Sequence, residues 1–342
     1  MRRRTWMSLA VVAAVVAALL VTVYLRKKAP PEVARLLPEA DAIVYFNLQP
    51  LRAITRFDQH PVAHDADYQS FIDATGIELE RDLDQAAFAV HRMADPNGPN
   101  GPVAFSEVFS GHFNGQRLNT YLAAQAQSTE RYAGHEIYSL AHDGRTVRVV
   151  MLGYDLVAVS NTPTAEQIHS IVDRYHSAAS PFTGDTLLAR HYSDVPLLSE
   201  VWGIGEIGLP FASGQHFQVF GLPLPVPIDS TFIASIRYLG ALHVQLEEIA
   251  PSPQVAKMSV GVANVALGIL RSAQVNAGPV GQQDATVRDW DAMLRSASVE
   301  QKGNRAILRA VVPISLVRSL VAATKTRGEG PSPNGQPVEP AP

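Results

Sequence analysis

An uncharged run of 21 residues near the N-terminus constrains this chain most. Residues 5–25, TWMSLAVVAAVVAALLVTVYL, contain no charged side chain. A helix of that length spans about 30 Å, the thickness of a bilayer's hydrocarbon core, and satisfies its backbone hydrogen bonds internally. Trp6 and Tyr24 stand near its two ends, where amphipathic rings prefer the membrane interface. The sequence therefore predicts one N-terminal transmembrane helix that contacts the lipid bilayer through residues 5–25.

The alternative for this segment is a cleaved signal peptide. Its apolar region usually has about 7–15 residues and ends in a small-x-small cleavage site. Here the run is longer, and VTVYLRKK at its end contains no such site. Basic residues flank both ends of the run, but a short basic N-terminus before a long C-terminal domain usually stays inside. We therefore expect a single-pass signal anchor in the bacterial inner membrane, with the soluble domain in the periplasm.

The part of the chain outside the anchor is acidic. Once the six flanking basic residues are set aside, 22 of the 28 basic side chains remain against 32 acidic ones, a formal net charge of −10. Such a domain lacks the basic surface that nucleic-acid binding requires. The chain contains no cysteine, which excludes disulfides, thiolate zinc sites and cysteine nucleophiles. We expect no nucleic-acid partner and no cofactor.

Alternating apolar residues, separated by turn residues, predict the elements of the N-terminal half. Strands are expected over 42–48, 86–92, 104–113 and 155–160, with a hairpin over 136–152 that turns at Asp143-Gly144. Helices are expected over 65–76, which Gly76 ends, and over 115–127. A further helix is expected to begin at Thr162 as N-cap, with Pro163 at its first position.

The C-terminal half shows a similar order of elements. Two strands are expected within 231–250, a helix that starts at Ser252-Pro253, and a hairpin over 297–313 that turns at 302–304. In that helix Val255, Met258, Val262, Val265 and Ile269 share one face. We therefore expect an α+β fold of two similar halves with antiparallel sheets and packed helices. The expected units are a membrane anchor at 1–28, halves at 36–180 and 181–326, and a disordered tail at 327–342.

The segment HPVAHDADYQ, residues 60–69, offers a first candidate metal site. His60, His64 and Asp67 are residue types that bind zinc, and two histidines four apart can share a helix face. Pro61 places His60 before the helix or in its first turn, however, and weakens that shared face. The favoured interpretation is a polar entry into the helix, whose N-terminus attracts aspartates.

A second candidate lies in the helix that follows Pro163. His169, Asp173 and His176 share one face, opposite Ile168 and Ile171. This stripe could bind zinc with help from another segment, or it could be the solvent-facing side of an amphipathic helix, which we favour.

The stretch GIGEIG, residues 203–208, matches the glycine pattern of dinucleotide-binding proteins. That site needs a helix to begin at the glycines, and Pro210 follows with no amphipathic pattern after it. Backbone packing explains these glycines better. The chain also contains no G-x-S-x-G, no P-loop and no H-E-x-x-H motif.

Residues 197–232 are rich in large apolar residues, glycine and proline, and are nearly uncharged. This composition fits either an irregular core segment that joins the two halves, or an apolar surface for a partner, lipid or hydrophobic ligand. In the second case the surface would contain Trp202, Phe211, Phe217 and Phe220.

Three stretches carry a resemblance to a known group: LLPEADAIVYFNLQPL, YQSFIDATGIELERDLDQAAFAV and WGIGEIGLPF. Over most of residues 36–326 the chain resembles uncharacterised single-pass bacterial envelope proteins of acidobacterial type. This resemblance implies a place in the cell envelope and transfers no catalytic residue.

Together these observations predict a membrane-anchored extracytoplasmic domain with a non-enzymatic interaction or structural role and an envelope protein as its partner. The alternatives are a metal-dependent hydrolase that uses one of the two histidine sites, and a carrier of an apolar ligand bound by the 197–232 segment.

Overall fold

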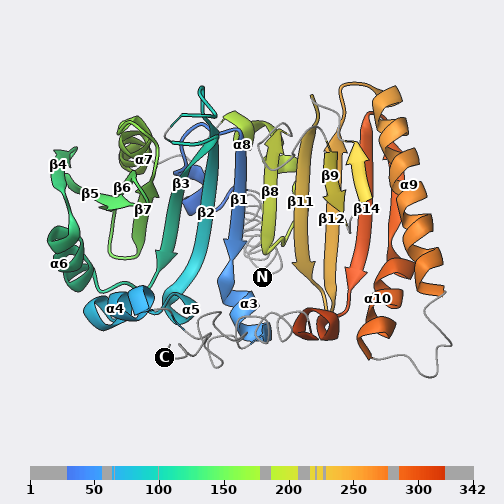
Figure 1. Ribbon diagram of the computed structural model, residues 1–342, viewed down its shortest axis with the longest axis horizontal. Helices are drawn as coiled ribbons and strands as arrows, with labels where there is room; N and C mark the ends of the chain where they lie inside the picture. Colours follow the sequence, from blue (N-terminus) through green and yellow to red (C-terminus); the bar gives the residue numbers. More distant parts are fainter. Residues whose placement is uncertain are drawn as a thin grey trace, which may run out of the picture.

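The computed structural model describes residues 29–55, 64, 66–98, 100–177, 186–206, 216–219, 222–225, 229–275 and 285–319. One antiparallel sheet of twelve strands extends through both halves of the chain (Figure 1). Its order is β13-β14-β12-β11-β8-β1-β2-β3-β7-β6-β5-β4, and β9 and β10 form a separate pair. A mixed helix and strand fold with a large antiparallel sheet is thus confirmed, whereas the two halves contribute to one sheet instead of forming separate sheets.

The strands have the following bounds. In the first half they are β1 Ala42–Asn47, β2 Leu83–Arg92, β3 Val103–Gly111, β4 Ser128–Tyr132, β5 His135–His142, β6 Arg145–Met151 and β7 Leu156–Ser160. In the second half they are β8 Val201–Glu206, β9 His216–Val219, β10 Leu222–Pro225, β11 Thr231–Tyr238, β12 Leu242–Ile249, β13 Ser298–Lys302 and β14 Arg305–Val312.

The helices connect these strands. They are α2 Glu32–Arg35, α3 Leu48–Thr55, α4 Ala66–Thr75, α5 Leu79–Asp82, α6 Gly115–Gln125, α7 Glu166–Ser177, α8 Thr186–His191, α9 Pro253–Val275 and α10 Ala285–Ser296, with a short 3-10 helix η2 at Tyr192–Asp194. Residues 5–25 and the tail at 327–342 lie outside the described residues.

The two halves of the chain meet at the pairing of β1 with β8. These strands run antiparallel, with Tyr45 opposite Trp202 and Ala42 opposite Gly205. A Cβ atom on Gly205 would lie 2.7 Å from the Ala42 Cβ atom, so glycine is required for this close approach. The GIGEIG stretch therefore begins within a central strand, and Gly203 and Gly205 serve backbone packing as expected, while Gly208 lies outside the described residues.

The main hydrophobic core lies on one face of the sheet, which we call the core face. Alternate residues of the central strands point into it, including Ile43, Ile204 and Ile233. Helices α2, α7 and α8 cover them with buried side chains such as Val33, Ile171 and Leu188. These side chains are at most 1% exposed, so the centre of the sheet is closed to solvent on this face.

The opposite face of the sheet carries smaller clusters at its two ends. At one end Leu118 and Leu122 of α6 pack against Tyr138, Val149 and Val157. At the other end the residues that pack together are Leu267 of α9, Leu294 of α10, Ala297, Val299 and Ala310. Helix α9 runs along the outer right-hand part of the molecule in Figure 1.

Most of the predicted elements are confirmed within two or three residues. The hairpin tip at Asp143-Gly144 has positive φ at both residues, 49° and 74°, as the predicted two-residue turn requires. Gly76, with φ of 74°, ends α4, and Ser252 lies at the start of α9, where its hydroxyl accepts from the Val255 N–H at 3.3 Å. One helix start was wrong, because α7 begins at Glu166 and not after Thr162.

The reason for that error lies in the contacts of Thr162. Its hydroxyl bonds to Ser160 Oγ at 2.9 Å and donates to the Thr164 carbonyl at 3.0 Å, so it does not cap the helix. The carbonyl oxygens of Thr162 and Thr164 both accept from the guanidinium of Arg148, at 2.9 and 3.3 Å. These bonds hold residues 162–164 in an extended turn that precedes the helix.

Candidate functional site

The first candidate metal site is divided between described and undescribed residues. His60 lies outside the described residues. His64 Nε2 lies 3.2 Å from Glu80 Oε1, and its ring packs edge-on against Tyr68 with centroids 4.6 Å apart. Asp67 is exposed in the first turn of α4, the position that the helix dipole favours. His64 thus contacts Glu80 of α5.

Glu80 organises the polar contacts between α4 and α5. The Tyr68 hydroxyl donates to Glu80 Oε2 at 2.8 Å and accepts from the Leu79 N–H at 2.7 Å. Burial alone would raise the pKa of Glu80, but hydrogen bonds from its own backbone N–H, Tyr68 and His64 outweigh it and lower the pKa. Burial and the bond to Glu80 raise the pKa of Tyr68 to about 12. These contacts indicate that the ionised Glu80 side chain holds α4 and α5 together.

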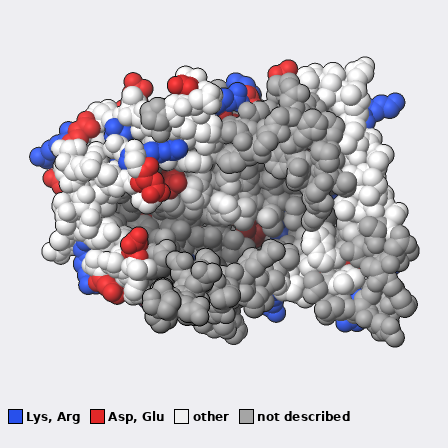
Figure 2. All heavy atoms as spheres, in the orientation of Figure 1, with Lys and Arg blue, Asp and Glu red and all other residues white. Residues whose placement is uncertain are grey.

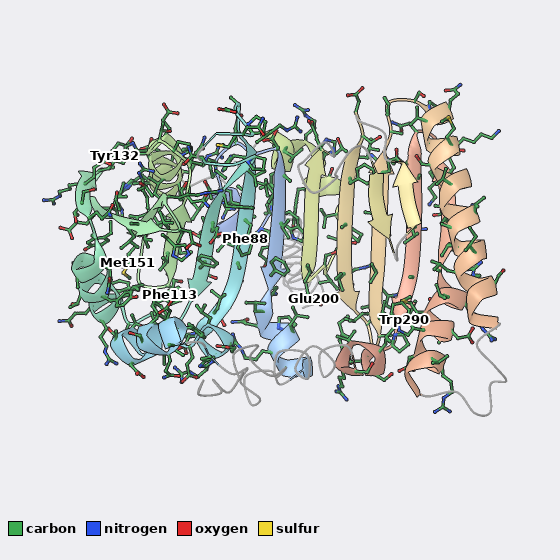
Figure 3. All side chains as sticks on the ribbon, viewed as in Figure 1. Phe88, Phe113, Tyr132, Met151, Glu200 and Trp290 are labelled. Carbon is green, nitrogen blue, oxygen red and sulfur yellow. The ribbon has the colours of Figure 1, made fainter. Side chains whose placement is uncertain are left out.

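The second candidate site lies on α7 and faces the β4–β5 hairpin. Tyr132 donates to the Asp173 carboxylate at 3.0–3.1 Å, and His176 Nε2 lies 3.0 Å from the Ala133 carbonyl oxygen. The His169 ring stacks on Tyr132 with centroids 3.9 Å apart and planes 7° from parallel. Figure 3 shows Tyr132 at the outer left-hand end of the sheet, next to α7. This side of the helix therefore contacts the hairpin, while Asp173 and His176 stay exposed to solvent.

His169 also approaches Glu130 without a well-formed hydrogen bond. Its Nε2 atom lies 3.0 Å from Glu130 Oε1, yet it is buried and not aligned with any acceptor. The stacking on Tyr132 fixes the ring, so packing decides its position. Across the part of the chain that the structure describes, no group of three His, Asp or Glu side chains is arranged to hold a metal ion.

A buried chain of hydroxyls contains the contact that most resembles a nucleophile and its base. His91 Nε2 lies 2.9 Å from Ser106 Oγ, which lies 3.2 Å from Ser160 Oγ. Ser106 is 0% exposed and His91 is 6% exposed, so no substrate reaches this pair. Burial lowers the pKa of His91, although the nearby Asp41 carboxylate acts in the opposite direction. These residues join β2, β3 and β7 on the core face.

Of the four aromatic residues expected at an apolar surface, only Trp202 has a described side chain. Trp202 is 1% exposed and packs against Tyr45 and Tyr192, so it belongs to the core and the surface interpretation is wrong for this residue. Phe217 lies in β9, and its side chain is outside the described part, as are Phe211 and Phe220 entirely.

An ionic cluster joins segments that are far apart in the sequence. Arg305 Nη1 lies 3.0 Å from Asp194 Oδ1 and 2.5 Å from Glu247 Oε1. The Glu247 side chain is 7% exposed, and its hydrogen bond raises the pKa of Arg305. Sequence reasoning missed this cluster because its members are 58 and 111 residues apart. It fixes η2 onto β12 and β14.

A row of exposed apolar side chains lies on α9. Four side chains of the helix are exposed: Met258 by 69%, Val262 by 36%, Val265 by 64% and Ile269 by 51%. Among the described residues, Pro253–Ser272 of α9 is the one stretch long and apolar enough to cross a membrane. In Figure 2 the upper right-hand edge, over α9, is mostly uncharged apart from basic atoms at its end. We call Met258, Val262, Val265 and Ile269 the α9 stripe.

Comparisons with known proteins found no matching family model and no matching curated protein. Among solved structures, the chain is similar to TP0453 in crystal form III, with 12% identity and a TM-score of 0.42 over 86% of this chain and 99% of that one. Crystal form I of TP0453 matches with 14% identity and a TM-score of 0.41, over 86% and 98% of the two chains. This similarity carries no argument about function.

Proposed function

We propose that this protein is a single-pass inner-membrane protein whose acidic α+β domain lies in the periplasm and has a non-enzymatic interaction or structural role in the envelope. The observation that carries this proposal is the α9 stripe. Burying such side chains gains about 25 cal/mol for each Å² of apolar area removed from water. An exposed row of four on one helix therefore indicates a contact surface.

The histidines that could act in catalysis support the same proposal. His64 is bound to Glu80, His176 to the Ala133 carbonyl, and His91 to a buried serine. Each of these contacts joins two elements of the fold. The groups that would serve a hydrolase are thus engaged in holding helices and hairpins in place, which favours an interaction role.

A second candidate function, carriage of an apolar ligand, is favoured by one observation. Phe46, Phe88 and Phe109 form an aromatic row across β1, β2 and β3, with successive centroids 5.9 and 5.8 Å apart. Phe88 lies near the middle of the sheet in Figure 3. Glu107 pairs in register with Phe88 on the same face, and burial raises the pKa of its carboxyl. Mass spectrometry of lipid released from the purified protein tests this candidate, and Phe88→Ala should reduce any lipid bound there.

Within this proposal we also infer that the two halves are related by duplication. β1, β2 and β3 are consecutive neighbours in the sheet, and so are β8, β11 and β12. In each half a helix follows, and the last strand returns beside the third, β7 beside β3 and β14 beside β12. The antiparallel β1–β8 pair is the arrangement that a two-fold relation between the halves requires.

The membrane topology can be tested with single cysteines, because the chain has none of its own. Ser128→Cys, at the exposed start of β4, should react with a membrane-impermeant maleimide in intact spheroplasts. The protein should also stay in the membrane pellet after alkaline extraction. Labelling only after lysis would place the domain in the cytoplasm and overturn the proposed location.

The interaction role can be tested with a photo-reactive amino acid at position 265 of the full-length chain in its own membranes. Adducts from this position, detected as gel shifts for protein or peptide mass shifts for lipid, are the expected result. The same group at position 128 is the control, because β4 is at the opposite end of the sheet. If position 265 forms no more adducts than position 128, the α9 stripe is not a contact surface.

A further inference from the structure

We propose that the α9 stripe lies on an anionic phospholipid bilayer, with α9 parallel to the membrane plane. This inference names the partner of the surface on which the proposed function depends, and it rests on the anchor expected at residues 5–25. It gives the domain a second membrane contact, made by a helix that lies on the bilayer instead of crossing it.

The geometry of α9 matches a helix that is buried on one side only. The stripe residues are spaced by four, three and four positions and therefore form one row about 17 Å long. On the other side Ala256 is 0% exposed and Leu267 is 7% exposed, and the helix packs on β13, β14 and α10. The stripe consequently points away from the domain.

Hydrogen bonds at both ends of α9 fix it to the domain. Arg271 donates to the carbonyl oxygens of Leu294 and Ala297, at 3.0 and 2.6 Å. Near the other end Gln301 Nε2 donates to the Pro253 carbonyl at 2.8 Å. Crossing a bilayer would require α9 to leave β13 and α10 and break these bonds. Although α9 is long and apolar enough to cross a membrane, we therefore place it on the membrane surface.

The charges of α9 select an anionic surface. Its 23 residues contain two charged side chains, Lys257 and Arg271, and both are basic. Arg271 is bound to the carbonyl oxygens of Leu294 and Ala297 on the docked side of the helix. Lys257 is exposed beside Met258, so its long side chain can reach lipid head groups while the apolar side chains enter the acyl boundary. The domain as a whole is acidic, so this local positive charge is the part that an anionic bilayer attracts.

A second copy of this chain is disfavoured as the occupant. A parallel pair of α9 helices would place the exposed Lys257 of one copy beside that of the other and bring positive charges together. Four exposed apolar side chains also fall short of the roughly 20–30 residues a side that a stable interface contains.

Because the expected anchor tethers the domain to the membrane, α9 needs only weak affinity for the bilayer to stay bound to it. Residue 29, where the described structure begins, follows the anchor segment directly. Tethering by a short linker raises the effective concentration of the second contact to the millimolar range, so it can form without high intrinsic affinity. Because the linker is short, the domain stays near the same membrane that holds the anchor.

The test uses the full-length chain in vesicles, with Val265→Cys labelled by an environment-sensitive fluorophore. One set of vesicles contains phosphatidylcholine alone, and the other an equal mixture with phosphatidylglycerol. The expected result is a blue shift and strong quenching by brominated lipid in the mixture, with much less of both in phosphatidylcholine. The same label at Ser128→Cys is the matched control and should show neither change.

Two variants separate the bilayer from a second copy. Lys257→Glu should reduce the dependence on phosphatidylglycerol, because it reverses the exposed basic charge beside the stripe. Gly261 and Gly268 are exposed on α9 and have open space where a Cβ atom would stand. The double variant Gly261→Ala with Gly268→Ala should keep the bilayer contact, whereas it would disrupt a close helix pair.

The outcomes distinguish failure of the inference from failure of the proposed function. If the chain floats with vesicles but the label at 265 is unchanged, the bilayer contact is wrong and the anchored function stands. Equal quenching in both kinds of vesicle overturns the anionic specificity. Energy transfer between labels at 265 without lipid quenching identifies a second copy as the occupant. A chain that floats with neither vesicle has no anchor, and both proposals fall.

Discussion

Trp202 stacks on Tyr45 across the β8–β1 pair, with ring centroids 5.3 Å apart and planes inclined by 25°. Trp202 is 1% exposed and Tyr45 is 4% exposed, and burial raises the pKa of the tyrosine far above its ordinary range. One ring comes from each half of the chain, and η2 adds Tyr192 at 5.4 Å from Trp202. The two halves of the sheet are therefore joined by a buried aromatic cluster as well as by backbone hydrogen bonds.

Trp202→Ala should destabilise the whole domain, because it leaves a cavity where the two halves meet. The expected loss in the free energy of unfolding is about 3–5 kcal/mol. Trp202→Phe keeps an aromatic ring and should lose clearly less. Chemical denaturation of the full-length protein in detergent, followed by circular dichroism, measures both. A Trp202→Ala variant as stable as the wild type would show that this cluster does not hold the halves together.

Two glycine-to-alanine substitutions should have opposite effects on stability. Gly205→Ala places a Cβ atom 2.7 Å from the Ala42 Cβ atom and should cost about 1–3 kcal/mol. Gly261→Ala meets nothing within 4 Å on exposed α9 and should gain about 0.5–1 kcal/mol, since alanine favours a helix. Denaturant midpoints of the two variants provide the comparison. A loss of stability in Gly261→Ala would contradict an open α9 face.

His91 should make the domain less stable between pH 7 and pH 5. Its pKa is lowered in the folded protein by burial, below the ordinary value of 6.5. The unfolded chain therefore binds the proton more readily, and the stability present above pH 6.5 is lost as pH falls toward the folded-state pKa. Thermal unfolding across this range measures the effect, and His91→Gln should flatten it. An equal slope in both proteins would assign the pH dependence to other groups.

The Arg305 cluster should behave as a coupled unit. Arg305→Met leaves the buried Glu247 carboxylate without its main partner and should cost about 3–5 kcal/mol. The double variant with Glu247→Leu should lose less than the sum of the two single losses, because no unpaired charge remains. The control is Arg295→Met: Arg295 is 72% exposed in its pair with Asp291, so the change should stay within about 0.5 kcal/mol. Additive losses in the double variant would argue against the coupling.

Local patterns in the sequence predicted most individual elements, because their causes are local. The Asp143-Gly144 turn needs two residues with positive φ, and residues of these types adopt that conformation readily. The start of α9 at Ser252-Pro253 follows from capping and from the fixed φ of proline. Thr162 fails the same rule, since its hydroxyl bonds to Ser160 within the buried network. A capping residue identified from sequence can thus be engaged by a neighbouring strand.

Features that depend on how elements dock were not predictable from the sequence. The spacing of Met258, Val262, Val265 and Ile269 identifies a common helix face, but the spacing is the same whether that face is buried or exposed. The packing of Leu267 of α9 against Leu294 of α10 determines that this face is exposed. The Arg305 cluster joins segments 58 and 111 residues apart, which no local pattern relates. The partners of the candidate histidines also come from other segments: His64 contacts Glu80, and His169 stacks on Tyr132.

The pairing of β1 with β8 means that β1 cannot complete its hydrogen bonds until β8 has been synthesised. β1 ends at Asn47, and its second partner begins only at Val201, so one edge of an apolar central strand stays unpaired while the intervening residues emerge. An unpaired apolar edge is a template for pairing with other chains. While the N-terminal half can fold before the C-terminal half is made, this edge is the place where the nascent chain needs protection from aggregation.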